Sequence, residues 1–292
     1  MTSSSVPAPA PMPAQGPPLR GRPLMSQLWR DITFVHWRVD PARLEPFLPA
    51  GVQPDVHDGA AWVGLIPFRM VDAAVGRGRP VPWLGTFLET NVRVYSRDAS
   101  GRRGVVFLSL DAERLPVVAG ARLVFGTPYQ WAGMRSSPRV VPADPAGTEV
   151  AYSLHRHRAP WRDATRAISA THGIRASRAG RAGSGSAEGR GARSVEPAVT
   201  SSMRVRVGEP LAEPGDLELF LTARFGLHTT VARRTLWVPN THAPWPLHRA
   251  ELLALDDRCV AAAGLDGVVS HAPDSVLFSP GVETTFGWPV RV

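Results

Sequence analysis

Residues 87–95 read Phe-Leu-Glu-Thr-Asn-Val-Arg-Val-Tyr, and the character of the side chains alternates at every step. The even positions are Leu88, Thr90, Val92 and Val94. The odd positions are Phe87, Glu89, Asn91, Arg93 and Tyr95. Successive side chains of a β-strand point to opposite faces of the sheet, so this stretch predicts a strand with one apolar and one polar face.

The polar face of this strand has two interpretations. It can face solvent, where it would carry a cross-strand ion pair. It can instead line the interior of a barrel, where Arg93 would bind a carboxylate or enolate and Glu89 would act as a general acid or base. Asn91 and Tyr95 would then be further ligand contacts. The aromatic residues at the two ends, Phe87 and Tyr95, favour the interior, but the pattern leaves both interpretations open.

Other strand-like stretches indicate a mainly-β fold. Runs rich in β-branched and aromatic residues occupy 31–39, 104–110 and 275–282. We expect 104–110 to pair with 87–95 across a turn at 98–101. The chain holds 29 Pro and 27 Gly residues, which favour turns over long helices. The prediction is a cone-like barrel or sandwich of antiparallel strands with a few short helices.

Shorter elements can also be placed. Residues 40–48 predict a short helix, because they open on an Asp-Pro pair that suits a helix start. Residues 52–56 and 60–70 predict a hairpin around an Asp-Gly turn. Residues 217–225 are expected to be helical, and residues 247–255 to form either a helix or a strand.

A single domain is expected over residues 25–292. Residues 1–24 are rich in Pro and Ala and predict a disordered tail. The domain is interrupted at about 172–200 by an Arg- and Gly-rich segment, which predicts a flexible insertion. The formal net charge is +8, and residues 155–193 alone hold nine arginines against two acids. Because the basic charge is concentrated there, we expect no specific nucleic-acid partner.

The composition excludes several mechanisms and locations. All 33 basic residues counted as Lys or Arg are Arg, so no Schiff-base lysine can form. The one cysteine, Cys259, excludes an internal disulfide and a paired-cysteine zinc site. No apolar run is long enough to span a bilayer, and no signal peptide is visible. We therefore expect a cytoplasmic protein without membrane association.

A series of short motifs in fixed order resembles the YqjF-like family, a family of unknown function. The motifs share aromatic, glycine and proline positions along the expected strands. They are Phe34-x-His36-Trp37, Pro49-x-Gly51-x-x-x-Asp55, Gly59-x-x-Trp62-Val-Gly-x-x-Pro67-Phe68, Glu89-x-Asn91-x-Arg93-x-Tyr95, Gly104-Val-x-Phe107-x-Ser109-Leu-Asp111, Phe220-Leu-Thr-x-Arg224 and His242-x-Pro244-Trp245-Pro246-Leu247. The resemblance covers residues 26–288, with the Arg-rich segment as an insertion.

That family is similar to the acetoacetate decarboxylase superfamily, which implies a mainly-β, cone-like barrel with an internal pocket. The decarboxylases carry their Schiff-base lysine in a Gly-x-Pro-Lys-Lys segment. The comparable segment here is Gly126-Thr-Pro128-Tyr129-Gln130, so Tyr129 and Gln130 stand at the lysine positions. Because a phenol or an amide cannot form an imine with a ketone, the resemblance implies the fold without the decarboxylase mechanism.

Four histidines are candidates for a functional role. His36 lies in an apolar strand and His242 in a Pro-rich turn; each can be a structural histidine or a group that faces the pocket. His155 and His157 can share one strand face, but no acid or cysteine lies near them at ligand spacing. We therefore predict no metal site.

Two arginines, Arg122 and Arg224, lie in apolar contexts. A buried arginine needs an acid partner, and Glu89 or Asp111 can supply it. Asp111 can alternatively cap the helix expected after it.

Three functions fit these residues. The first is an enzyme acting on a small oxo acid or related carbonyl compound, in which Arg93 with Arg122 or Arg224 holds the carboxylate while Glu89 and Tyr129 move protons. The second is a non-catalytic small-molecule binding protein on the same barrel. The third is a purely structural ion-pair network. The expected partner is a small-molecule ligand, with no cofactor and a possible homo-oligomer.

Overall fold

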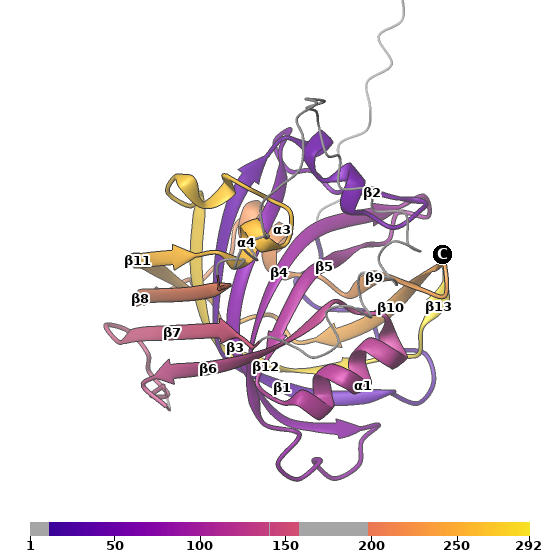
Figure 1. The fold of residues 1–292 in the computed structure, drawn as a ribbon, viewed down its shortest axis with the longest axis horizontal. Coiled ribbons are helices and arrows are strands. Elements are labelled where there is room, and N and C mark those ends of the chain that lie inside the picture. Colours follow the sequence, from indigo (N-terminus) through magenta and orange to yellow (C-terminus); the bar gives the residue numbers. More distant parts are fainter. Residues whose placement is uncertain (1–11, 140, 158–197) are drawn as a thin grey trace, which may run out of the picture.

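The computed structural model describes residues 12–139, 141–157 and 198–292. Strands dominate it, which confirms the mainly-β prediction (Figure 1). The strands are β1 (Met25–Val39), β2 (Val52–Pro54), β3 (Ala61–Val75), β4 (Phe87–Asp98), β5 (Arg103–Ala112), β6 (Tyr129–Ser137), β7 (Glu149–Arg156), β8 (Thr200–Pro210), β9 (Gly226–Val231), β10 (Arg234–His242), β11 (His248–Asp257), β12 (Ser275–Phe286) and β13 (Val290–Arg291). The α-helices are α1 (Leu115–Phe125), α3 (Asp216–Thr222) and α4 (Cys259–Ala262). The 3-10 turns are η1 (Pro41–Arg43), η2 (Glu45–Phe47) and η3 (Val268–Ser270).

The strands form one sheet that closes on itself twice. One ring of pairings runs β4–β5–β6–β7–β8–β11–β12–β1–β3 and returns to β4. A second ring runs β12–β1–β3–β4–β5–β9–β10 and returns to β12. The rings share β12, β1, β3, β4 and β5, which we call the shared wall. Figure 1 shows β6, β7, β8 and β11 on one side of this wall, and β9, β10 and α1 on the other.

Most neighbouring strands run antiparallel, as expected for a chain with many short connections. Two pairings are parallel instead: β5 with β6, and β5 with β9. Each parallel pairing is short, and together they join β5 to one strand of each ring, β6 and β9. These parallel contacts are therefore where the two rings diverge.

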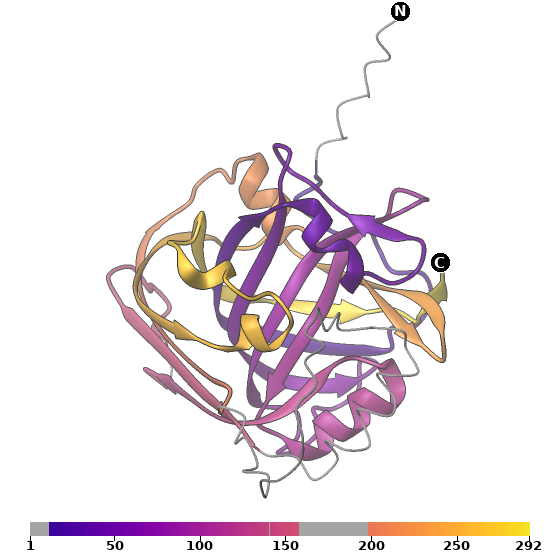
Figure 2. The same cartoon turned by 45° about the horizontal axis from the view of Figure 1, so that its top comes forward.

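The first compartment, enclosed by the ring through β6, β7, β8 and β11, has an apolar core. Val63 and Val92 of the wall pack there in one cluster with Tyr152 of β7 and Met203 of β8. The segment with α4 and η3 lies over one end of this compartment (Figure 2). Buried and more exposed side chains alternate along β7 and β8, because one face of each strand packs in this core and the other face lies outside it.

The second compartment lies on the opposite face of the wall and contains two apolar clusters. The Trp245 cluster includes Trp245, Phe34 and Phe68. The Phe220 cluster includes Phe220, Leu221 and Tyr95. Trp29 packs against both clusters and therefore marks their junction. Since the wall has an interior compartment on each side, its strands are buried on both faces.

The β4–β5 hairpin predicted from residues 87–95 and 104–110 is confirmed. The two strands pair antiparallel from Arg97 and Arg103 at the turn to Glu89 and Ala112 at the far end. Residues 217–225 and 247–255 resolve as the helix α3 and the strand β11.

Two local predictions need correction. The stretch 40–48 forms the two 3-10 turns η1 and η2 in place of one helix, because Pro46 lacks the N–H that a continuous helix would need. The hairpin between 52–56 and 60–70 is wrong. β2 pairs with the end of β4, and only His57 and Ala60 bridge across the Asp-Gly turn.

Residues 1–11 of the predicted tail and 172–197 of the predicted insertion lie outside the described residues. On either side of that gap, β7 and β8 pair antiparallel from Glu149 to His155. No helix in the described part of the chain is long and apolar enough to cross a membrane.

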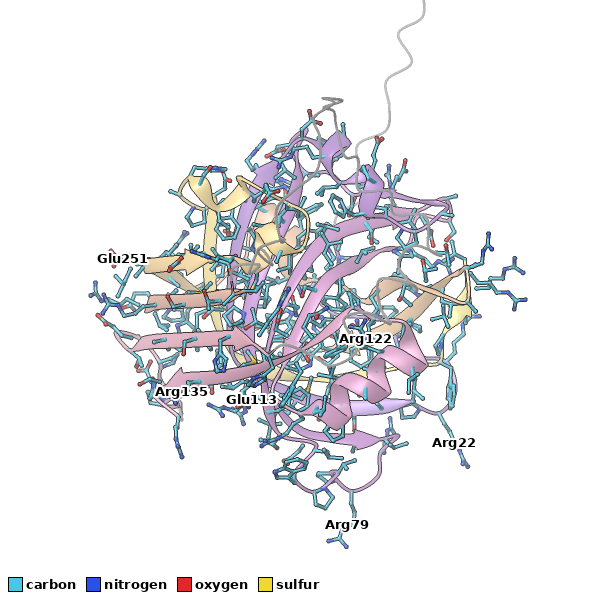
Figure 3. The ribbon with its side chains drawn as sticks, viewed as in Figure 1. Arg22, Arg79, Glu113, Arg122, Arg135 and Glu251 are labelled. Atoms are coloured by element: carbon cyan, nitrogen blue, oxygen red, sulfur yellow. The ribbon has the colours of Figure 1, made fainter. Side chains whose placement is uncertain are left out.

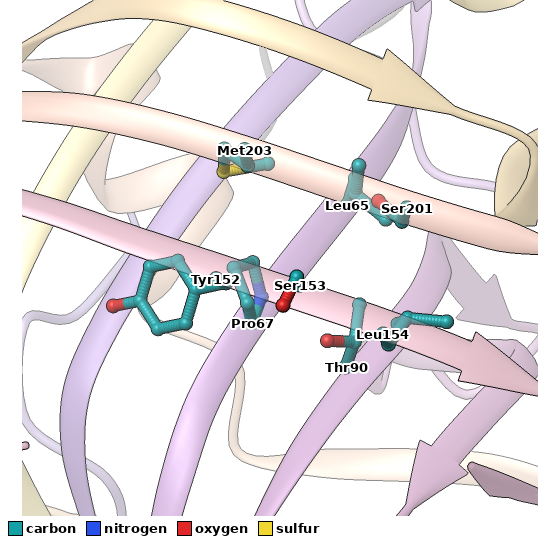
Figure 4. Close-up of a pocket in the computed structure, with 8 residues that line it drawn as sticks. All are labelled: Leu65, Pro67, Thr90, Tyr152, Ser153, Leu154, Ser201 and Met203. Carbon is teal, nitrogen blue, oxygen red and sulfur yellow. The ribbon is translucent and has the colours of Figure 1, made fainter. Parts of the chain in front are cut away.

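Two cavities border the strands β7 and β8, and the larger one, of about 410 Å³, is lined by residues that include Arg135, Tyr152 and Arg204. The smaller cavity, of about 10 Å³, lies between the wall residues Leu65 and Thr90 and the facing residue Tyr152 of β7 (Figure 4). That volume corresponds to about one water molecule. A cavity of this size cannot hold an organic ligand.

Candidate functional site

The polar face of β4 is buried in the second compartment. The exposed fractions of its polar side chains are 3% for Glu89, 5% for Asn91, 5% for Arg93 and 0% for Tyr95. The opposite face is buried as well, since Val92 and Val94 are 0% exposed in the first compartment. The solvent-facing interpretation of this strand is therefore wrong. Both faces are interior because β4 belongs to the shared wall.

Three wall strands bring polar groups into one row beside Arg93. Backbone pairing places Gly64 of β3 next to Arg93, and His36 of β1 next to Gly64. A Cβ at Gly64 would lie 3.0 Å from the His36 ring. The glycine therefore leaves the space in which His36 Nε2 meets the Tyr95 hydroxyl at 2.6 Å.

Glu89 and Tyr129 form a buried hydrogen-bonded pair. The Tyr129 hydroxyl, at the start of β6, donates to Glu89 Oε2 at 3.0 Å. Burial raises the pKa of the Glu89 carboxyl to about 8; the hydrogen bond from Tyr129 opposes this rise and the charge of Asp111 adds to it. Burial and the neighbouring Glu89 raise the pKa of Tyr129 well above its usual value. Glu89 therefore holds its proton at neutral pH and loses it just above.

Arg93 is a buried cation with no carboxylate partner among the described residues. Its Nη2 donates to the main-chain oxygen of Leu221 at 2.9 Å and to the Tyr95 hydroxyl at 3.1 Å. The Tyr95 hydroxyl donates to the same Leu221 oxygen at 2.8 Å. Burial, with the charges of Arg93 and Arg224, lowers the pKa of His36 well below its usual value. His36 is therefore neutral, and Arg93 keeps an uncompensated positive charge.

Arg224 adds a second buried guanidinium. Its Nη1 binds Asp55 Oδ2 at 2.5 Å, and Arg103 Nε binds the same carboxylate oxygen at 2.7 Å. Asp55 is thus the acid partner of Arg224, and the prediction that Glu89 or Asp111 would fill that role is wrong. Burial lowers the pKa of Arg224 to about 10, against the effect of Asp55. Arg224 is still charged at neutral pH, so one carboxylate serves two cations and the region stays positive.

The carboxyl end of α3 faces this cluster with three successive main-chain carbonyls. They are Phe220, bound by Arg224 Nε at 2.6 Å, Leu221, bound by Arg93 and Tyr95, and Thr222, bound by Trp245 Nε1 at 3.0 Å. Free carbonyls at the carboxyl end of a helix carry partial negative charge. The end of α3 therefore places partial negative charge beside Arg93 but no full charge.

Several buried polar atoms on this side of the wall have no hydrogen-bond partner among the described residues. They are Asn91 Oδ1, Trp29 Nε1, Thr284 Oγ1, His36 Nδ1 and Arg224 Nη2. Buried polar groups are nearly always paired, because an unpaired one costs about 1–3 kcal/mol. A concentration of them around one row of side chains favours a polar ligand there.

His242 and Trp245 lie at the edge of the same compartment. His242 Nδ1 lies 2.7 Å from the main-chain oxygen of Ala243, and its ring centroid is 5.2 Å from that of Trp245. Burial is the main cause that lowers the pKa of His242. One ring nitrogen of His242 thus has a structural partner, and Trp245 is buried in the apolar cluster beside it.

Arg122 does not join Arg93. It lies half-buried on α1 (Figure 3), and its Nη1 donates to the main-chain oxygen of Tyr129. Asp111 pairs with Arg156 at 2.5 Å on the first-compartment side, so the predicted Asp111–Arg122 pair is wrong. The contact made by Arg122 fixes the backbone of Tyr129. Arg22 and Arg79, in contrast, project from the periphery (Figure 3).

His155 of β7 and His157, just after this strand, show no metal geometry. The rings of His155 and His157 lie edge to face with centroids 4.9 Å apart, and His157 packs against Trp131. The described residues contain no cluster of three side chains able to hold a metal ion.

Comparison with known proteins places the chain in a sequence family and in a fold group. Residues 26–283 match the DUF2071 family, which is described as an uncharacterized conserved protein. The uncharacterized protein YqjF of Bacillus subtilis (strain 168) is 27% identical over 271 residues, which cover 92% of each chain.

Solved structures with the same fold are enzymes of low sequence identity. The enduracididine biosynthesis enzyme MppR, complexed with pyruvate, superposes with a TM-score of 0.54 at 16% identity and covers 93% of this chain and 91% of its own. An acetoacetate decarboxylase-like enzyme from Sphingomonas wittichii RW1 gives a TM-score of 0.54 at 14% identity and 92% coverage of both chains. At these identities the likeness establishes the acetoacetate decarboxylase-like fold alone. The family match spans most of the sequence, and the chain therefore belongs to the DUF2071 (YqjF-like) family.

Proposed function

We propose that this protein is a small-molecule enzyme that moves protons on an oxo acid or a related carbonyl compound without forming an imine. One observation carries the proposal: a carboxyl that titrates near neutral pH and a cation with no carboxylate partner share one buried strand face. Arg93 would bind the acid group of the substrate. Glu89, held by Tyr129, would transfer the proton.

The proposed proton transfer needs no reactant other than the substrate. Ionised Glu89 would take a proton from the carbon next to the carbonyl group, and the bonding electrons would move to the carbonyl oxygen. The Tyr129 hydroxyl would stabilise the resulting enolate, and Glu89 would return the proton to oxygen or to carbon. A general base works best when its pKa lies near the working pH, and burial of Glu89 provides that condition.

The fold neighbours agree with this class of chemistry. One is called an acetoacetate decarboxylase-like enzyme, and another is described with bound pyruvate. The chain has no lysine, so the imine route is closed and acid–base chemistry by Glu89 is the available alternative.

The test is hydrogen–deuterium exchange at the carbons next to the carbonyl of short and long oxo acids, followed by NMR in D₂O. We expect exchange above the buffer rate, at least hundredfold slower exchange with Glu89→Gln, and weaker binding with Arg93→Met. Wild-type protein that exchanges no oxo acid above the buffer rate would refute the enzymatic proposal.

A non-catalytic binding protein is the second candidate. It is favoured by the fact that the Tyr129 and Tyr95 hydroxyls already donate to Glu89 and to Leu221. Thermal stabilisation by an oxo acid that Arg93→Met abolishes, with no isotope exchange, would identify this alternative.

A further inference from the structure

The polar row of β4 runs from one apolar cluster into the other. Glu89 lies at the Trp245 cluster, where Phe68 is its backbone neighbour and Tyr129 its hydrogen-bond donor. Arg93 lies at the Phe220 cluster through its contacts with Tyr95 and Leu221. The acid–base group and the cation therefore occupy opposite ends of the row.

The spacing along the strand separates these two ends widely. Four residues of β-strand span about 13 Å at roughly 3.3 Å per residue. The Arg93 guanidinium hydrogen-bonds to the hydroxyl of Tyr95, which lies two residues further along β4 from Glu89. A short 2-oxo acid carries its carboxylate and carbonyl on adjacent carbons, joined by one bond of about 1.5 Å. Such a molecule cannot place one group at Arg93 and the other at Glu89.

The region between the two ends is aromatic and holds one polar contact point. Trp29 stacks on Trp245 with centroids 5.8 Å apart, and Phe34 meets Trp245 edge-on at 5.3 Å. Phe34 also lies 5.5 Å from the Cζ atom of Arg93. Asn91, between Glu89 and Arg93 on the strand, is 5% exposed and its Oδ1 has no partner among the described residues.

We propose that the substrate is a distal oxo acid, whose carboxylate and reactive carbonyl are separated by an apolar, aromatic body. This inference rests on the proposed function and specifies the substrate class. The carboxylate binds Arg93, the carbonyl end reaches Glu89 and Tyr129, and the body packs against Phe34 and Trp245. Flat aromatic bodies suit this position because rings pack well against rings in offset or edge-on geometry.

Binding of a graded ligand panel to the full-length protein tests the assignment. The ligands are 2-oxobutanoate, 4-oxopentanoate, 6-oxoheptanoate and 3-(4-acetylphenyl)propanoate, with dissociation constants from calorimetry. We expect affinity to rise along the series, with the aromatic acid at least tenfold tighter than 2-oxobutanoate. The methyl ester of the aromatic acid and its deoxy analogue, 3-(4-ethylphenyl)propanoate, should each bind at least fivefold more weakly.

Two variants test whether the affinity depends on the Trp245 cluster. Trp245→Phe should weaken binding of the aromatic acid by more than it weakens 6-oxoheptanoate. Trp83→Phe is the matched control, because Trp83 is 66% exposed and packs on Arg114. It should leave both affinities unchanged.

The outcomes separate the two proposals. If 2-oxobutanoate binds as tightly as the aromatic acid and exchanges its protons in a Glu89-dependent way, the distal-acid assignment is wrong and the proposed function stands. If no member of the panel binds or exchanges protons, both are wrong. If Trp245→Phe and Trp83→Phe act alike on the aromatic acid, the placement of the apolar body is wrong.

Discussion

The Tyr129 hydroxyl donates a 3.0 Å hydrogen bond to Oε2 of Glu89, a residue 40 positions earlier in the chain and 3% exposed. The contact joins β6 to the shared wall.

Replacing Glu89 with Gln should flatten the pH dependence of stability between pH 5 and 8. The pKa of Glu89 is raised on folding to about 8. Above its unfolded pKa the unfolded chain has released this proton while the folded protein keeps it, so rising pH favours unfolding until the folded pKa is passed. The wild-type free energy of unfolding should therefore fall relative to Glu89→Gln by up to about 1.4 kcal/mol per pH unit. Urea unfolding at pH 5.5, 7 and 8.5 measures this. Parallel pH profiles for the two proteins would contradict it.

Replacing Tyr129 with Phe should raise the pKa of Glu89 further, because the hydrogen bond from Tyr129 lowers it. The lost bond should cost about 0.5–1.5 kcal/mol of stability. Infrared detection of the protonated carboxyl during a pH titration, with Glu89→Gln as the blank, reports the shift directly. A carboxyl that ionises at lower pH in the variant would be the opposite of the expected result.

Replacing Arg93 with Met should leave a folded protein that no longer binds oxo acids. The Leu221 oxygen keeps the hydrogen bond from Tyr95, and removal of a buried unpaired charge offsets the contacts that are lost. We expect a change in unfolding free energy of no more than about 2 kcal/mol. Circular dichroism and ligand-induced thermal shifts measure the two effects. A variant that fails to fold would support the purely structural role of this residue.

Asp55→Asn should be strongly destabilising. It removes the one carboxylate that Arg103 and Arg224 share, and Arg224 has an exposed side-chain fraction of only 2%. Breaking a buried ion pair from one side costs about 3–5 kcal/mol. The exposed pair of Glu149 and Arg206 is the control, and Glu149→Gln should cost far less because solvent screens exposed pairs. If the two variants lose the same free energy of unfolding in urea, burial does not make the Asp55 ion pairs more important for stability.

Gly64→Ala should be destabilising although β3 is a regular strand. The new methyl group would lie 3.0 Å from the His36 ring and would disturb its hydrogen bond with Tyr95. We expect a loss of about 1–3 kcal/mol. Gly120→Ala in α1 is the matched change, because its Cβ would meet nothing within 4 Å and should stabilise the helix by about 0.5–1 kcal/mol. Thermal unfolding compares the two; a neutral Gly64→Ala would contradict the close-approach argument.

The sequence predicts the strand β4 and its two faces well, because alternation with period two is a local property. It cannot show that both faces are interior, since that depends on β9 and β10, which close a second ring more than a hundred residues later. The hairpin at 52–70 is wrongly predicted for the same reason. A local turn signal is present, but β2 finds its partner at the end of β4.

In the candidate site, too, the residues in local motifs are predictable from the sequence and the long-range contacts are not. Glu89, Arg93 and Tyr129 lie in recognisable motifs, and Glu89 and Arg93 share one buried strand face. Asp55 appears in the same motifs, but its pairing with Arg224 spans 169 positions and has no local signal. The main-chain oxygen of Leu221 could not be predicted at all, because side-chain identity says nothing about which carbonyl a helix end presents.

The shared wall has a consequence for how the molecule comes apart. Neither compartment can open alone without exposing one face of β1, β3 and β4, whose residues are largely buried. The two halves are therefore expected to behave as one cooperative folding unit. Main-chain amides of these three strands should be the slowest in the protein to exchange with solvent, and those of the edge strands β2 and β13 among the fastest.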